Sequence, residues 1–579
     1  MTTITAFFAA INCLYTLVKY ATYNEANYDL VIFDQAIRSY AHFHLGISII
    51  KGLHDGFGPN FSVLGDHFSP MDMALAPLDW IYDGPQTLLV AQGVLFALAI
   101  PWLWVYTRRA MGGSGRKATA AAYFACAAYG LSWPIAAAMA FGYHEVAFVP
   151  LLTAIALERL QAGKLRAGLI ALGLLLLVKE DMGLLVAGIG VALAVSFSPT
   201  VRRQRLVGLI LVVVGVSYTY FATSVLIPAF GGRANYYWAY SALGQNIPQL
   251  VGHLISHPGQ FFQLMVSPSI KLRTWEWLFG VFCLLPLLSP LTLAALPLLA
   301  ERMLGGRAYD HWWGTHFQYN AFIVTILVFA AVDGAVRLDR WATRAWQYLE
   351  SRRTTAAQAR LAEGVGAGSL AAEAAGAGSV PAEVLGADPG PASSTSAAVT
   401  GTSDSIGPGV TSPGAARTLD PVRRIGTGVV GFACCVAISL AGFYSVRDFA
   451  FDGLLSARFY HMTNRQRAVA AVDAKVPSGV VVAAANFAGA ELSGRDTVLM
   501  WDGDGYASAF AAPWVVADTW RPELGWASLA DQRADVALLE RHGYRVVFTD
   551  RGLYVLHRSG TPNLSLRSRP LDLSPRSAG

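Results

Sequence analysis

Charged residues are scarce in this sequence. Asp, Glu, Lys and Arg together supply only 14% of the 579 residues, whereas a soluble protein has roughly 25%. Hydrophobic residues supply 54%, and long apolar runs recur from the N-terminus to residue 446. This composition excludes one large soluble core and indicates a polytopic membrane protein. The net charge of +5 comes from short basic clusters between apolar runs, which is not the pattern of a nucleic-acid-binding surface.

Cysteine is also rare, and its positions exclude several kinds of site. None of the five cysteines lies in a polar loop with the spacing of a disulfide framework or a zinc site. They are all in apolar segments: Cys13, Cys126, Cys283, Cys434 and Cys435. The sequence also lacks a P-loop, a dinucleotide fingerprint, an H-E-x-x-H motif and a nucleophile elbow. These absences argue against an ATP-driven pump and a metalloprotease.

The apolar runs form about eleven segments, several of them shorter than the ~20 residues that cross a bilayer squarely. The first, from Ile4 to Val18, lacks the basic start and the cleavage site of a signal peptide, so we interpret it as a retained span. Lys and Arg gather in alternate loops, which places the N-terminus in the cytoplasm and the C-terminus outside. These basic clusters lie at 108–117, 159–166, 202–205 and 337–353.

Changes of composition divide the chain into domains. Residues 1–350 are the predicted membrane domain, with a long first outer loop at 21–85. Residues 351–422 are rich in Ala, Gly, Ser and Pro and lack hydrophobic periodicity, which predicts a disordered cytoplasmic linker. The last span is expected at 423–447 and a disordered tail at 566–579.

Residues 448–565 predict a small extracytoplasmic α/β domain, because short strand-like runs alternate with helical ones. The predicted strands lie in GVVVAAA, TVLMWDG, PWVVADT and YRVVFTDRGLYVLHR, and the predicted helices in HMTNRQRAVAAVDAKV and LADQRADVALLERHG. The expected fold class is therefore an α-helical polytopic membrane protein of about 11 transmembrane helices with this small outer domain.

Ionisable residues gather in the loops that this topology places outside. Such residues at membrane depth are energetically expensive, which makes them candidates for function. Asp29 and Asp34, in the first outer loop, are the candidate catalytic carboxylates. The candidates for substrate binding are Asp66, His67, His144, Glu145, Lys179, Glu180, Asp181, Arg233 and His316. Because their loops face one side, we expect these side chains to converge.

Each candidate also has a purely structural interpretation. Asp34 and Arg38 are four residues apart and can form a surface pair, whereas Asp29 and Asp34 do not share a helical face. The charged triplet at 179–181 can pair internally at a helix junction, although its apolar flanks make a solvated surface a poor explanation. Arg233 can bind phosphate or extend to the membrane interface.

Several stretches resemble a family of predicted bacterial membrane proteins, domain of unknown function 2079. The stretches are YDLVIFDQAIRSY, LGDHFSPMDMALAPL, FGYHEVAFVPLL, LLVKEDMGLLVAGIGVAL and YRVVFTDRGLYVLHR. The resemblance spans nearly the whole chain apart from the linker and implies a multi-pass protein of the bacterial plasma membrane. The family is in turn similar in layout to the C-type glycosyltransferases (GT-C), which transfer a sugar from a polyprenyl-phosphate donor on the outer face.

The resemblance implies transfer of a sugar from such a donor to an envelope glycan or glycolipid. Asp29 or Asp34 would be the general base, since GT-C enzymes carry an acidic catalytic residue in the first outer loop. Arg233, Lys179 or a divalent metal such as Mg or Mn would take up the charge of the leaving phosphate. No nucleotide, haem, zinc or nucleic acid is expected.

Two other classes of function remain open at this point. One is a transporter or lipid flippase, with the charged triplet at 179–181 as its coupling site; an internal repeat, which we do not find, would favour it. The other is a non-catalytic envelope assembly or sensory protein whose outer domain binds a partner. That alternative predicts that the outer carboxylates can be neutralised without loss of function.

Overall fold

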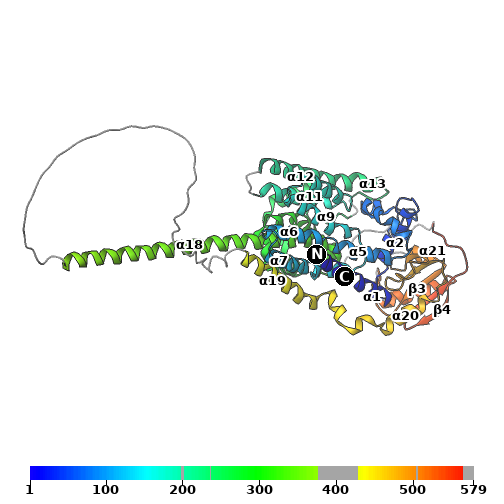
Figure 1. Cartoon of the computed structure of the whole chain (residues 1–579). Helices are drawn as coiled ribbons and strands as arrows, with labels where there is room; N and C mark the ends of the chain where they lie inside the picture. Colours follow the sequence, from blue (N-terminus) through cyan, green and yellow to red (C-terminus); the bar gives the residue numbers. More distant parts are fainter. Residues whose placement is uncertain (197–200, 235–236, 376–427, 504–505, 524, 565–579) are drawn as a thin grey trace, which may run out of the picture. The chain divides into compact units, whose positions relative to one another are not determined.

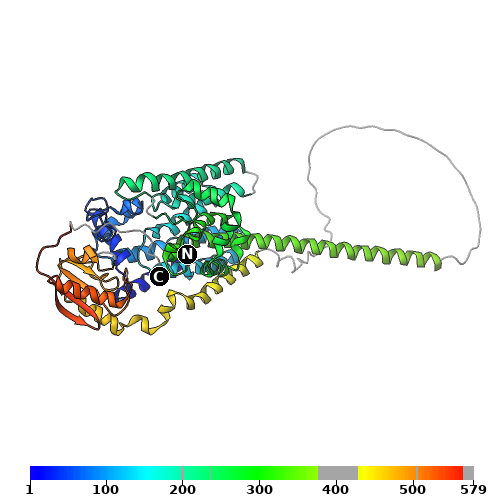
Figure 2. The same cartoon turned by 180° about the vertical axis from the view of Figure 1, so that it is seen from behind.

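The computed structural model describes the chain except for residues 197–200, 235–236, 376–427, 504–505, 524 and 565–579 (Figure 1; Figure 2 gives the reverse view). The chain divides into two units, one made of residues 1–339 with residues from 430 onward, and one made of residues 340–429. Most of the predicted linker belongs to the second unit. There α18 (Ala321–Ala375) continues as a helix past residue 351, because its Ala-rich sequence favours helix. The rest of the predicted linker, residues 376–422, and the predicted tail at 566–579 lie outside the described residues.

Six helical stretches of the described chain are long and apolar enough to cross a membrane. The protein is therefore helical and membrane-like, while the total of about eleven spans stays a prediction. The six stretches are α1 (Thr2–Ala21), α5 with α6 (Gln86–Ala97, Ile100–Ala110), α7 with α8 (Arg116–Gly130, Trp133–Ala140), α12 with α13 (Val201–Phe221, Ile227–Ala229), the first part of α18, and α19 (Val429–Ser445).

The other apolar segments form short or interrupted helices. The first three are α9 (Val149–Gln161), α10 (Leu165–Leu175) and α11 (Met182–Val195), with 11 to 14 residues each. They are followed by α14 (Ile247–Ser256), α15 (Pro258–Val266), α16 (Ser269–Gly280) and α17 (Leu296–Leu304). Between α16 and α17 the chain forms 3-10 turns around Pro286 and Pro290, because proline lacks the backbone N–H that a continuous helix needs.

The helices α11 and α12 pack closely through glycine. A Cβ atom on Gly183 would lie 2.3 Å from the carbonyl oxygen of Gly215, and one on Gly190 would lie 2.5 Å from that of Gly208. Small residues of this kind let helix backbones approach each other in membranes. Elsewhere α12 leaves large aliphatic side chains exposed, for example Val213 at 65%, which makes that surface suitable for lipid contact.

The first long loop is largely structured. It contains α2 (Tyr28–Ala41), α3 (Ile49–His54), α4 (Ala76–Asp79) and the 3-10 turns η1 (Val63–Gly65) and η2 (Pro70–Leu75). The amphipathic pattern of α2 predicts one exposed face, but nine of its 14 residues are buried. The reason is that α2 is covered on two sides. Phe33 packs edge-on against Tyr143, 5.3 Å between ring centroids, while Gln35 Nε2 donates a hydrogen bond to Val498 O at 2.9 Å.

The C-terminal domain is a five-stranded mixed sheet with the order β2-β1-β3-β5-β4. β1 pairs in parallel with β2 and β3, whereas β5 is antiparallel to both β3 and β4. The strands are β1 (Val481–Ala484), β2 (Thr497–Met500), β3 (Trp514–Asp518), β4 (Arg545–Asp550) and β5 (Leu553–His557), and the helices are α20 (Asn464–Asp473), α21 (Tyr506–Ala511) and α22 (Leu529–Arg541). The predicted strands and the two predicted helices are confirmed.

The C-terminal domain lies directly against α2, as Figure 1 shows for α2 and α21. Asn27 Nδ2 donates to Ala485 O at 3.2 Å, and the backbone N–H of Tyr28 donates to Asn486 Oδ1 at 3.1 Å. Because these hydrogen bonds are buried or partly buried, they hold the start of α2 on the sheet.

Candidate functional site

The structure joins many of the predicted site residues in one group of buried ionisable side chains. We call it the polar cluster and define it as Asp29, Lys51, Asp55, Asp66, His67, His144, Glu145, Lys179 and Glu180. They come from α2, α3, the turn after η1, the loop before η3 (Glu145–Phe148), and the loop between α10 and α11. Most of these side chains are at most about one-seventh exposed, the exceptions being Asp29 and His67.

Asp29 has the most exposed side chain of the cluster, at 37%. Its Oδ1 lies 3.9 Å from Nε2 of buried His144, which is too long for a hydrogen bond. The His144 ring stacks on Phe141, 5.1 Å between centroids, and meets Phe33 edge-on. Burial lowers the pKa of His144, so its imidazole is held neutral. The carboxylate of Asp29 is therefore accessible and is not committed to a strong ion pair.

Two buried ion pairs lie beside this carboxylate. Lys179 Nζ is 2.7 Å from Glu145 Oε1, and His67 Nδ1 is 2.8 Å from Glu180 Oε1. The second oxygen of Glu180 accepts the backbone N–H of Phe68 at 3.1 Å. Burial and Lys179 disfavour a charged His67 ring, but Glu180 and Asp66 outweigh them and raise the pKa of His67. The pair of His67 with Glu180 connects the first loop to the loop between α10 and α11, and the pair of Lys179 with Glu145 connects the latter loop to η3.

Lys51, which is not among the predicted site residues, links the remaining acids. Its Nζ lies 2.8 Å from Asp55 Oδ2 and 3.1 Å from Asp66 Oδ1. Tyr237 donates to the same Asp66 oxygen and stacks on His67, 4.9 Å between centroids. Burial opposes the charge on Lys51, but Asp66 and Tyr237 raise its pKa well above the ordinary value. The one signal for Lys51 was its place inside the apolar run GISIIKGL.

Asp34 lies apart from the cluster and faces the C-terminal domain. Its buried carboxylate accepts hydrogen bonds from Ser493 Oγ and from Arg38 Nη2, the latter at 3.1 Å. Burial, only partly offset by Arg38 and Ser493, raises the pKa of Asp34 to about 6. Arg38 also pairs with Asp83 at 2.7 Å. In this structure Asp34 therefore serves to attach α2 to the C-terminal domain.

Within the described residues, the other three predicted residues do not join the ion pairs of the cluster. Asp181 precedes α11, and burial raises its pKa to about 7 despite Lys179. The guanidinium of Arg233 lies over the ring of Phe57, 4.9 Å from its centroid. His316 is exposed in the loop before α18.

Two buried cations, Lys271 and Arg302, form a second group. As a site residue, Lys271 was only weakly indicated by the sequence, and Arg302 was not predicted. Lys271 is 1% exposed and Arg302 4% exposed. Lys271 Nζ donates to Met303 O at 2.6 Å and lies 4.0 Å from the ring centroid of Trp313. Arg302 donates to Asn320 Oδ1 at 2.8 Å and to Tyr319 O at 3.0 Å.

The charges of these two cations are not neutralised by direct ion pairs. Within the described residues, neither Lys271 nor Arg302 forms an ion pair with a carboxylate, so their hydrogen bonds are satisfied but their positive charges are not. Burial lowers the pKa of Lys271 to about 8. The signal for Arg302 was a charged residue in the apolar stretch LPLLAERML.

A row of aromatic rings connects Arg302 to His144, the neighbour of Asp29. Phe141, which stacks on His144, meets Phe317 at 4.7 Å between centroids. Phe317 in turn lies 6.0 Å from Tyr319, whose ring is 5.5 Å from the Arg302 guanidinium. The arrangement therefore places an accessible carboxylate and unneutralised positive charge at the two ends of one aromatic row.

The residues present do not fit a bound metal. Within the described part of the chain, no group of three or more His, Cys, Asp or Glu side chains is arranged to hold a metal ion. The best-formed pockets lie elsewhere, at the junction of α1 with the C-terminal domain, and share no residue with the polar cluster.

The fold and the site together define a class, a helical membrane protein whose inter-helix loops hold a cluster of buried ionisable residues. The chain belongs to the family of predicted membrane proteins called domain of unknown function 2079, whose sequence profile matches residues 19–352. This match confirms the family resemblance seen in the sequence.

Two solved structures are similar to this chain. ArnT from Cupriavidus metallidurans bound to undecaprenyl phosphate is 12% identical, with a TM-score of 0.43 over 95% of this chain and 98% of that chain. The archaeal oligosaccharyltransferase AglB from Archaeoglobus fulgidus, in complex with an inhibitory peptide and a dolichol-phosphate, is 11% identical, with a TM-score of 0.36 over 96% and 74% of the two chains. A comparison with curated proteins finds no match.

Proposed function

We propose that the protein is a GT-C-like membrane glycosyltransferase that moves a sugar from a polyprenyl-phosphate donor to an acceptor of the cell envelope. The observation that carries the proposal is the position of Asp29, whose accessible carboxylate lies beside neutral His144. The cation Arg302 lies at the other end of the aromatic row. A base and a separate positive charge are the two groups that transfer from a phosphate leaving group needs.

Asp29 is the proposed general base. The acceptor hydroxyl oxygen attacks the anomeric carbon of the donor sugar, and its proton passes to the Asp29 carboxylate. The bond between that carbon and the phosphate oxygen breaks, and its electron pair leaves with the lipid phosphate. Asp34 is a poor alternative because Ser493 and Arg38 already occupy its carboxylate.

Lys271 and Arg302 are proposed to stabilise the departing phosphate. Two buried positive charges without carboxylate partners create a strong positive potential in a low-dielectric setting. The exposed aliphatic surface of α12 and the apolar helices around the site offer the prenyl chain a lipid-side approach. Since basic residues occupy the alternate loops, the polar cluster is proposed to face away from the cytoplasm of a bacterial cell.

A transfer assay with purified full-length protein in lipid nanodiscs tests the proposal. Undecaprenyl-phosphate glucose and undecaprenyl-phosphate mannose serve as donors, and release of undecaprenyl phosphate is measured with an envelope glycolipid extract as acceptor. Asp29→Asn should lower the rate about 10²- to 10⁴-fold, because it removes the base without changing the shape of the side chain. Asp34→Asn is the matched control on the same helix and should keep most of the rate, because the asparagine Oδ1 can still accept the hydrogen bond from Ser493 that holds α2 on the C-terminal domain.

The outcomes separate the proposal from its rivals. Equal rates for wild type and Asp29→Asn would exclude Asp29 as the base. Movement of lipid phosphate between leaflets without sugar transfer, abolished in Lys179→Met, would instead establish the flippase alternative.

A further inference from the structure

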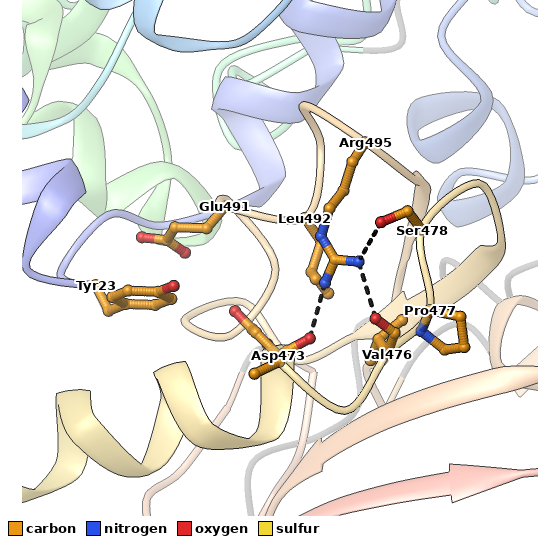
Figure 3. Close-up of a pocket in the computed structure, with 9 residues that line it drawn as sticks. Tyr23, Asp473, Val476, Pro477, Ser478, Glu491, Leu492 and Arg495 are labelled. Atoms are coloured by element: carbon orange, nitrogen blue, oxygen red, sulfur yellow. Dashed lines mark hydrogen bonds between the residues drawn. The ribbon is translucent and has the colours of Figure 1, made fainter.

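A pocket of about 400 Å³ lies where the end of α1 meets the C-terminal domain (Figure 3). Its polar lining includes Tyr23, Asp473, Ser478, Glu491 and Arg495, with apolar atoms from Val476, Pro477 and Leu492. Figure 3 shows Tyr23, Glu491 and the Asp473 side chain gathered on one side, and Arg495 with its hydrogen-bond partners on the other. The volume is within the range of sites that hold small organic ligands, roughly 300–1,000 Å³.

Asp473 is placed where a carboxylate is energetically unfavourable for three reasons. It is 3% exposed, and within the described residues neither of its carboxylate oxygens has a hydrogen-bond partner. It is also the last residue of α20, where the helix dipole repels negative charge. Burial, together with Glu491, raises its pKa well above the ordinary value. A buried carboxyl group without hydrogen-bond partners is unusual in a native protein, and contact with a ligand is a functional reason to keep one.

Glu491 adds a second carboxylate without a full set of partners. Its buried Oε1 has no hydrogen-bond partner within the described residues, and burial raises its pKa to about 8. Tyr23, between α1 and α2, adopts the left-handed backbone conformation with φ of 56°, which is strained for a side chain of this size. That conformation directs the aromatic ring toward the two acids, where it can contact a cation through its face.

Arg495 does not neutralise these acids directly. Its Nη1 donates to Val476 O at 2.8 Å and its Nη2 to the backbone oxygen of Asp473 at 2.8 Å, not to the carboxylate. Its nearest anion is Asp496, 3.3 Å away. The pocket therefore keeps an excess of acidic side chains that face empty space.

We propose that this pocket binds a ligand carrying a protonated amine, with Asp473 and Glu491 accepting its N–H groups and Tyr23 covering it. A bare metal ion fits less well, because the volume far exceeds that of an ion and no third acid completes a ligand set. The pocket is large enough for a body the size of one sugar ring. This binding does not depend on the transferase reaction proposed above, since the pocket shares no residue with the polar cluster.

Saturation-transfer NMR on the full-length protein in nanodiscs at pH 7 tests this binding. The probe is glucosamine, and N-acetylglucosamine is the matched neutral sugar. Glucosamine should bind, and acetylation should weaken binding at least tenfold. Asp473→Asn and Glu491→Gln should each weaken glucosamine binding by a similar factor, whereas Glu540→Gln, at an exposed acid of α22 outside the pocket, should leave it unchanged.

Protein stability provides the second measurement. Because Asp473→Asn replaces a buried carboxyl group whose oxygens have no hydrogen-bond partner within the described residues, it should leave the melting temperature unchanged or raise it. Glu491→Gln carries the test if the first variant does not fold. Equal binding of the two sugars, unchanged binding by both variants, or displacement of glucosamine by CaCl2 alone would overturn the amine site.

Discussion

Glu145→Gln provides the sharpest test of the polar cluster, because it breaks a buried ion pair of known geometry. Glu145 Oε1 lies 2.7 Å from Lys179 Nζ, and the two side chains are 3% and 13% exposed. Burial alone would raise the pKa of Glu145, but Lys179, His67 and His144 lower it from 4.5 to about 2. The glutamine keeps the size of the side chain and removes only its charge.

The expected loss of stability is about 3 kcal/mol at pH 7. The shift from 4.5 to about 2 corresponds to about 3 kcal/mol of stabilisation of the charged form, and breaking a buried pair typically costs about 3–5 kcal/mol. Because the folded-state pKa is lowered, this contribution is complete above the unfolded pKa and is lost as the pH falls from 4.5 toward 2.

A double-mutant cycle measured by denaturant unfolding in detergent, with tryptophan fluorescence as the probe, gives the interaction directly. Glu145→Gln and Lys179→Met should each destabilise strongly, and the double variant should lose little more than either one. Arg337→Gln is the matched control, since its pair with Asp333 has the same 2.7 Å distance but is 37% and 27% exposed, and should lose less than about 1 kcal/mol. Additive losses in the double variant would refute the reasoning.

Three further predictions concern other charged contacts. Burial raises the pKa of Asp34 to about 6, so docking of the C-terminal domain should weaken as the pH rises through 6; protease release should show this in wild type and not in Asp34→Asn. Burial lowers the pKa of Lys271 to about 8, so binding of undecaprenyl phosphate should fall above pH 8 in titrations of wild type, and Lys271→Met should weaken it about tenfold at pH 7. His54 Nδ1 lies 2.7 Å from Asp502 Oδ2, and its pKa is raised because Asp502 outweighs burial. Thermal unfolding of His54→Phe should therefore show a larger loss of stability at pH 6 than at pH 8.

The local pattern of the sequence predicted the C-terminal domain well. The strands are short apolar runs near Gly, Pro or Asp, and the two predicted helices, α20 and α22, start at a Thr or Ser that caps them. Such signals lie within a few residues of one another, so no knowledge of tertiary structure is needed to read them. The membrane helices were harder, because an apolar run of 15 residues looks the same whether it spans a bilayer or ends at a buried turn.

The sequence could not predict the partners of individual charged side chains, because these partners are far away along the chain or are backbone groups. Asp34 is hydrogen-bonded to Ser493, which lies 459 residues further along the chain, and the pairing of Asp34 with Arg38 alone suggested a surface contact. Arg302 is held by backbone carbonyl groups of the loop before α18, and carbonyl groups carry no sequence signal. The distribution of Lys and Arg predicted that the acid-rich loops face one side of the membrane. Ion pairs join residues from several of these loops in the structure. The catalytic roles of these residues stay proposals.

The helix α2 explains why one loop carries both candidate acids. Asp29 and Asp34 are five residues apart, which is about 140° around a helix, so one faces His144 while the other faces Ser493. The C-terminal domain therefore fixes α2 through Asp34 and Gln35, and in doing so fixes the direction of Asp29. Under the proposed function this support is needed, because a displacement of about 1 Å in a catalytic group can lower a rate about a hundredfold. The domain thus belongs to the scaffold of the site, and loosening it by Ser493→Ala should slow sugar transfer although Ser493 touches no substrate.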